Sequence, residues 1–125
     1  MRRFLPVLLL IASLAMGVRA QTASVASPDG SLVVSFTLED GRPTYRIDRF
    51  GLPLILPSRM GFVLQEQPPL VGPFRLIGVA RDTVDTVWTQ PWGEKKDIRS
   101  HYHELRLQLE ETSERPRRMN IVFRV

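Results

Sequence analysis

The sequence predicts an all-β fold built from antiparallel hairpins, and three observations carry that prediction. Apolar and polar residues alternate over 31–39, 103–110 and 118–125, the period-two pattern of strands with one buried face. Turn-forming pairs such as Asp40-Gly41 separate the runs. No window places apolar residues at helical spacing over three turns. The chain has 125 residues, which allows a single domain.

The first twenty residues have the features of a secretory signal peptide. An arginine pair precedes an apolar run over 4–16, and small residues stand at positions 18 and 20, ahead of Gln21. The run is shorter than the roughly 18 residues that a membrane-spanning helix needs. We therefore expect cleavage after Ala20, a periplasmic or secreted protein, no membrane association after cleavage, and a domain over residues 21–125.

Charge and cysteine content exclude several classes of function. The signal segment holds three of the 17 basic residues and none of the 13 acidic ones, so the remainder is close to neutral. No run or face concentrates the basic residues as phosphate binding requires, and nucleic acid is not an expected partner. The chain has no cysteine, which excludes disulfides and thiolate metal sites.

The first half of the domain predicts three short strands joined by tight turns. Ser31–Glu39 follows the turn Ser27-Pro28-Asp29-Gly30 and buries one face. Asp40-Gly41 joins it to Thr44–Arg49 as a hairpin. Leu52–Leu56 comes next, and Pro53 within it indicates a strand that lies at an edge or begins at this residue, because proline lacks the backbone donor that a central strand needs.

The second half predicts further strands around one long loop. Phe62–Leu64 is a short strand, and 65–73 is a loop by its three prolines and glycine. Phe74–Val79 is a strand, and Arg81–Thr89, which is polar with embedded apolar residues, is a twisted or bulged one.

The last two strands form the clearest hairpin of the chain. Both present an apolar face with period two, made by His103, Leu105, Leu107 and Leu109 and by Met119, Ile121, Phe123 and Val125. The alternation runs to the final residue, so we expect the N-terminal piece of a longer polypeptide. We also expect the apolar face of this hairpin to lack an opposing layer and the fragment to be poorly soluble.

Two histidines raise the question of a metal site. His101 and His103 are two apart on a strand and point the same way, which suits a metal ion bound by two imidazoles. No later histidine supplies a third ligand, so a structural pair is the favoured interpretation. A metal-binding β-barrel using His101 and His103 is the less favoured alternative.

Carboxylates and aromatic residues are the candidates for a sugar-processing site. A glycosidase needs two carboxyl groups facing each other across the substrate, and the local sequence aims no two of the candidates into one cleft: Glu66, Asp82, Asp85, Glu94, Asp97 and Glu104. We therefore expect no catalytic residue. Trp88, Trp92 and Tyr102 could form a sugar-stacking platform, or could be core and loop residues, and their spacing leaves both open.

A family resemblance adds to this interpretation. The chain resembles the start of glycoside hydrolase family 97 in blocks that come in the family's order and cover most of residues 21–125. The blocks are Ser27-Pro28-Asp29-Gly30, 40–45, Leu56-Pro57-Ser58-Arg59-Met60-Gly61-Phe62, Trp88 with Pro91-Trp92-Gly93-Glu94, 98–105 and 119–125. The chain departs from the family pattern at Ser100 and His103, where asparagine is expected.

The resemblance implies an architecture and an activity for a longer parent enzyme. The parent would combine an N-terminal β-super-sandwich, similar to the galactose mutarotase-like fold, with a (β/α)₈ catalytic barrel and a small C-terminal β-domain. It would be a calcium-dependent α-glucosidase or α-galactosidase whose catalytic carboxylates lie in the barrel. No catalytic or metal residue transfers to this chain, and no cofactor is expected in it.

The predicted role follows from that placement. Residues 21–125 would be a partial, non-catalytic N-terminal β-sandwich domain that packs on the barrel of the same polypeptide and shapes the pocket for an α-linked oligosaccharide. The candidates for the rim of that pocket are Trp92, Glu94, Arg99, His101 and Tyr102. A stand-alone periplasmic carbohydrate-binding module is the alternative function.

Overall fold

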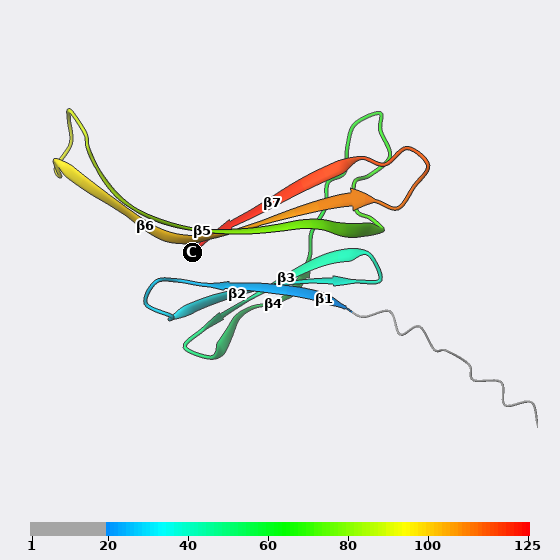
Figure 1. Ribbon diagram of the computed structural model, residues 1–125, viewed down its shortest axis with the longest axis horizontal. Coiled ribbons are helices and arrows are strands. Elements are labelled where there is room, and N and C mark those ends of the chain that lie inside the picture. Colours follow the sequence, from blue (N-terminus) through cyan, green and yellow to red (C-terminus); the bar gives the residue numbers. More distant parts are fainter. Residues whose placement is uncertain (1–19) are drawn as a thin grey trace, which may run out of the picture.

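The computed structural model describes residues 20–125 and shows two antiparallel sheets stacked face to face (Figure 1). The expected signal peptide, apart from Ala20, lies outside the described residues. Sheet 1 has the order β1 (Gln21–Ala26), β2 (Leu32–Glu39), β3 (Arg42–Arg49) and β4 (Leu52–Arg59). Sheet 2 has the order β5 (Phe74–Thr89), β6 (Asp97–Glu111) and β7 (Arg118–Arg124). The predicted all-β class of antiparallel hairpins is confirmed.

The described part of the chain consists of strands, turns and loops. Among residues 20–125, no helix is long and apolar enough to cross a membrane. The predicted hairpin at Asp40-Gly41 is confirmed, with Glu39 paired to Arg42 across the turn. Both turn residues have positive φ, 49° and 73°, the conformation that matches the twist of the flanking strands.

Strand β4 lies at the edge of sheet 1, as its proline predicted. It runs farther than the sequence indicated, to Arg59, and its pairing with β3 is interrupted by two irregularities. Its apolar residues do not all reach the core. Three leucines of β4 are between 61% and 71% exposed, namely Leu52, Leu54 and Leu56.

Two strand boundaries in the middle of the chain were predicted wrongly. Phe62–Leu64 forms no strand, only a single bridge between Phe62 and Leu70, because prolines crowd the loop that follows. Phe74–Val79 and Arg81–Thr89 are not two strands but one, β5, since the irregularity is a bulge between Leu76 and Gly78 rather than a break at residue 80.

The core fills the space between the two sheets. β2 contributes Val34, Phe36 and Leu38, and the leucine ladder of β6 faces them with every side chain fully buried. The ladder consists of Leu105, Leu107 and Leu109. The expectation that the apolar face of the last hairpin lacks an opposing layer is therefore wrong, because sheet 1 covers it.

Two glutamates on the opposite face of β6 are also buried, which the alternating pattern did not indicate. Glu104 and Glu110 are each only 6% exposed. Arg106 and Arg124 donate to Glu104 at 2.7 and 2.8 Å, while Arg75 and Arg118 donate to Glu110. Long arginine side chains thus cover the carboxylates on a face that sheet 1 does not reach.

Strands β5 and β6 extend well beyond the sandwich as a two-stranded ribbon, here called the arm. β7 pairs with β6 from Glu110 to Glu104, and Val125 adds two backbone hydrogen bonds to His103. The arm is defined as residues 84–102, from the pair Val84–Tyr102 to the turn at 90–96. Figure 1 shows it curving away from sheet 1. Among the described residues, no third strand flanks it.

Candidate functional site

The arm contains all five residues predicted for the rim of a sugar pocket. Its register follows from the turn at its tip, where Gln90 N donates to Lys96 O at 2.9 Å and Thr89 Oγ1 donates to Asp97 Oδ1 at 2.8 Å. Pairing continues from Thr89–Asp97 without interruption to Val84–Tyr102. Successive side chains of each strand therefore alternate between the two faces of the arm.

The first face continues the inner face of sheet 2 and is polar. Arg99 binds Asp85 with two hydrogen bonds, from Nε to Oδ1 at 2.8 Å and from Nη2 to Oδ2 at 2.7 Å. His101 pairs with Asp85 across the strands. The hydrogen bonds from Arg99 hold the pKa of Asp85 below its ordinary value of 3.8, so this carboxyl is an anion at neutral pH.

The second face continues the outer face of sheet 2 and is largely apolar. Tyr102 lies opposite Val84, Trp88 lies opposite Ile98, and the hydroxyl pair Thr86–Ser100 stands between them. Trp88 is 50% exposed. Arg124, from the end of β7, places its guanidinium carbon 5.6 Å from the ring centre of Tyr102.

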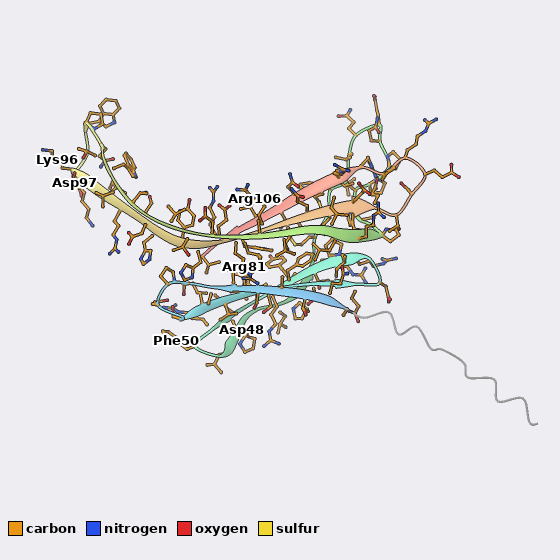
Figure 2. All side chains as sticks on the ribbon, viewed as in Figure 1. Asp48, Phe50, Arg81, Lys96, Asp97 and Arg106 are labelled. Atoms are coloured by element: carbon orange, nitrogen blue, oxygen red, sulfur yellow. The ribbon has the colours of Figure 1, made fainter. Side chains whose placement is uncertain are left out.

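The tip of the arm holds the remaining two predicted residues, Trp92 and Glu94. Both are exposed, Trp92 to 81%. Figure 2 labels Lys96 and Asp97 near this end of the arm, far from Arg106 on the outer side of sheet 2. The tip thus presents an indole ring and a carboxylate beyond the sandwich.

The structure gathers the five predicted residues on one projection but not into one site. Arg99 and His101 share the polar face, Tyr102 lies on the apolar face, and Trp92 and Glu94 lie at the tip. Sequence reasoning left the role of Trp88 open and missed Arg124. Trp88 is one of the apolar residues embedded in the polar segment 81–89, which gave a signal for it, but its partner across the ribbon depends on the turn register.

A separate hollow lies where the arm leaves the sandwich. It is an open groove of about 710 Å³ between β1 and the base of the arm, and its lining includes Ser24, Ala26, Arg81, Thr83 and His103. Nδ1 of His103 lies 2.7 Å from the carbonyl oxygen of Ala26. None of the five predicted rim residues lines this groove.

The histidine pair was the candidate metal site. His101 and His103 do share the polar face, as their spacing predicted. Within residues 20–125, no group of three or more histidine, cysteine, aspartate or glutamate side chains gathers at metal-binding geometry.

Comparison with protein families places the chain in a known group. Residues 25–125 match the family model described as glycosyl-hydrolase 97 N-terminal. A retaining alpha-galactosidase of Bacteroides thetaiotaomicron is 32% identical over 84 residues, which is 67% of this chain but 12% of that protein.

Solved structures agree with the family match. The chain is similar to a glycoside hydrolase family 97 enzyme from Pseudoalteromonas sp. strain K8, solved in complexes with panose and with acarbose, at a TM-score of 0.76 and 25% identity. The match covers 82% of this chain and 15% of that enzyme. A beta-arabinopyranosidase shares the fold at a TM-score of 0.70 and 23% identity. This chain therefore spans a small part of the length of its relatives.

Proposed function

Because this chain belongs to glycosyl hydrolase family 97 as an N-terminal domain, we propose that it is the non-catalytic β-sandwich segment of an exported α-glycosidase. It packs on the catalytic barrel of the same polypeptide and shapes the rim of the sugar pocket. The parent enzyme hydrolyses α-glucosidic or α-galactosidic bonds. The alpha-galactosidase relative and the panose and acarbose complexes of the Pseudoalteromonas enzyme support this substrate class.

The non-catalytic role is supported by the state of the carboxylates. Hydrogen bonds from arginines lower the pKa of four carboxyl groups among the described residues: Asp85, Glu104, Glu110 and Glu111. A glycosidase acid needs the opposite, a raised pKa, so that it holds a proton at neutral pH. These four carboxylates are therefore unsuited to donate a proton to a leaving group.

The observation that carries the pocket-shaping role is the arm. It extends beyond the sandwich (Figure 1), and its tip carries two exposed residues, Trp92 and Glu94. An indole ring can stack on a pyranose, and a carboxylate can accept hydrogen bonds from sugar hydroxyls. A projection with both groups can reach the pocket of an adjoining barrel without disturbing the core of this domain.

Steady-state kinetics of the full-length enzyme test the proposal. Trp92→Ala and Glu94→Ala should raise KM about tenfold on an α-linked oligosaccharide and leave kcat nearly unchanged, because rim contacts bind ground state and transition state alike. Ser35→Ala, on the outer face of sheet 1, is the control and should change neither constant. A hundredfold loss of kcat in either variant would contradict the proposal, because it would indicate that the arm takes part in catalysis. An unchanged KM in both arm variants would show that the tip does not contact the substrate in the pocket.

Export and calcium dependence belong to the same proposal. Mass spectrometry of the exported protein should find Gln21 at the N-terminus. The family resemblance implies calcium in the parent enzyme, but the described residues do not gather a ligand set of their own. We place the requirement in the barrel, so EDTA should inactivate the full-length enzyme and leave the melting temperature of the isolated chain unchanged.

A further inference from the structure

The apolar face of the arm carries two aromatic side chains, Trp88 and Tyr102, with a pair of hydroxyl residues between them. Trp88 and Tyr102 lie on the same face and come from opposite strands. Tyr102 pairs with the position four residues before Trp88, so the two rings are about 13 Å apart along the ribbon at roughly 3.3 Å per residue. The face therefore offers two aromatic groups at a separation suited to an extended ligand rather than to one small ring.

Polar groups fill the interval between the two rings. The cross-strand pair Thr86–Ser100 lies between Trp88 and Tyr102 on this face, and each hydroxyl can both donate and accept a hydrogen bond. Arg124 lies against Tyr102 and donates to Glu104 through Nε only. Among the described residues, the Nη groups of Arg124 have no hydrogen-bond acceptor, which leaves their donors for a ligand.

The shape and rigidity of this face favour a bound molecule. The arm curves toward the side of sheet 2 that sheet 1 leaves uncovered, so the aromatic side is its concave side (Figure 1). The neighbouring carboxylate of Glu104 is already held by Arg106 and Arg124, which fixes the polar floor next to the arm. A preorganised floor costs little entropy when a ligand binds.

We propose that the concave face of the arm, made by Trp88, Tyr102, Thr86, Ser100 and Arg124, is a saccharide-binding site of this domain. The ligand is a neutral, hydroxyl-rich oligosaccharide whose apolar ring faces stack on Trp88 and Tyr102. Its hydroxyls bond to Thr86, Ser100 and the guanidinium of Arg124. The choice of an α-linked sugar rests on the proposed function, but the aromatic and hydroxyl arrangement does not.

The chain provides its own reporter for this binding. It contains two tryptophans, so Trp92→Phe leaves Trp88 as the sole indole, and Trp88→Phe leaves Trp92. Purified protein is titrated with maltotriose while tryptophan fluorescence is recorded. Trp92→Phe should show a saturable change, and Trp88→Phe should show none.

Further variants test the rest of the site. Tyr102→Ala in the Trp92→Phe background should weaken the apparent Kd about tenfold, which corresponds to about 1.4 kcal/mol. Val87 precedes Trp88 and lies on the opposite face of the arm, so Val87→Ala should leave Kd unchanged. Circular dichroism and the melting temperature confirm that each variant is folded, and Trp88→Tyr, which keeps an aromatic ring, should retain part of the affinity in calorimetry.

Two results would overturn the proposal. One is the absence of a saturable signal in Trp92→Phe up to about 50 mM maltotriose, a concentration that fills any site with millimolar Kd. The other is a signal that survives in Trp88→Phe and disappears in Trp92→Phe, which would move the sugar to the tip. The pocket-rim role is tested separately, by KM of the Trp92→Ala and Glu94→Ala variants of the full-length enzyme, so the failure of this site and the failure of that role are distinguishable.

Discussion

The imidazole of His103 on β6 is hydrogen-bonded to the carbonyl group of Ala26 on β1, with Nδ1 2.7 Å from the oxygen. The carbonyl can only accept, so Nδ1 carries the proton and donates it. The bond joins one sheet to the other at the base of the arm. A side chain that the sequence offered as a metal ligand thus links the two layers of the fold.

Removing this link should weaken the sandwich. His103→Phe keeps a planar ring but leaves the Ala26 carbonyl without its donor, and we expect a loss of about 1 kcal/mol in the free energy of unfolding. His101→Phe removes an exposed imidazole on the same strand and should change stability by less than about 0.5 kcal/mol. Urea denaturation measures both. Equal effects of the two variants would show that the hydrogen bond from His103 to Ala26 does not stabilise the contact between the sheets.

The leucine ladder should show the energetic signature of a covered core. Leu107 is fully buried, so Leu107→Ala should cost about 2–5 kcal/mol through lost apolar contact and the cavity left behind. Leu54 on β4 is 61% exposed, and Leu54→Ala should cost less than about 0.5 kcal/mol. Denaturant unfolding of the two variants makes the comparison. Similar small losses would mean that sheet 1 does not cover β6.

Acid should destabilise the protein through Glu104 and Glu110. The hydrogen bonds from Arg124 and Arg75, respectively, contribute most to holding the pKa of each glutamate below its ordinary value of 4.5. A lowered folded-state pKa adds stability that is complete above the unfolded pKa and is lost as the pH falls through the folded pKa. The melting temperature should therefore stay level above about pH 5 and fall below about pH 4.5.

Variants identify the groups responsible for the fall in melting temperature at acid pH. Glu104→Gln combined with Glu110→Gln should flatten the fall in melting temperature between about pH 4.5 and pH 2, while lowering stability at neutral pH. Arg124→Met should flatten it in part, since it removes the main donor to Glu104. Parallel profiles of the native protein and the double variant would assign the acid sensitivity to other groups.

Two glycines with the same backbone conformation should differ in their tolerance of a side chain. Gly41 and Gly51 have φ of 73° and 75°, so alanine at either position is strained by about 1 kcal/mol. A Cβ at Gly41 would also lie 2.6 Å from Cβ of Pro73 and 2.9 Å from the amide nitrogen of Phe74, whereas at Gly51 it meets open space. We expect Gly41→Ala to cost about 3 kcal/mol, because the contact between the sheets must shift. Thermal denaturation of both variants checks this, and equal losses would contradict the close approach.

Alternation in the sequence predicted which side of each strand is apolar, but not what lies against it. The ladder of β6 was identified correctly. It packs against β2, about seventy residues earlier in the chain, and a local pattern cannot indicate a contact over that distance. The same alternation places Glu104 and Glu110 on the face away from the ladder, in agreement with the cross-strand pairing. Their burial depends on arginines from three strands and could not be read from one.

The sequence predicted which segment carries the candidate site, but it did not predict how the residues of that segment are arranged in space. All five rim candidates lie on the arm, because the Trp-Gly-Glu turn and the strand after it were recognised as one unit. Their division between two faces and a tip depends on the register of the turn at 90–96. Trp88 and Tyr102 belong to opposite strands, and only the pairing Val84–Tyr102 shows that they share a face.

The prolines and irregularities of β4 have a consequence for how copies of this protein behave in concentrated solution. Pro53 and Pro57 each remove an amide donor, and the two shifts in pairing bend the strand. A neighbouring molecule that approaches the leucines of β4 meets a broken row of hydrogen-bonding groups, a poor template for cross-β stacking. The exposed leucines of β4 therefore lie on an edge that is poorly suited to seed fibrils.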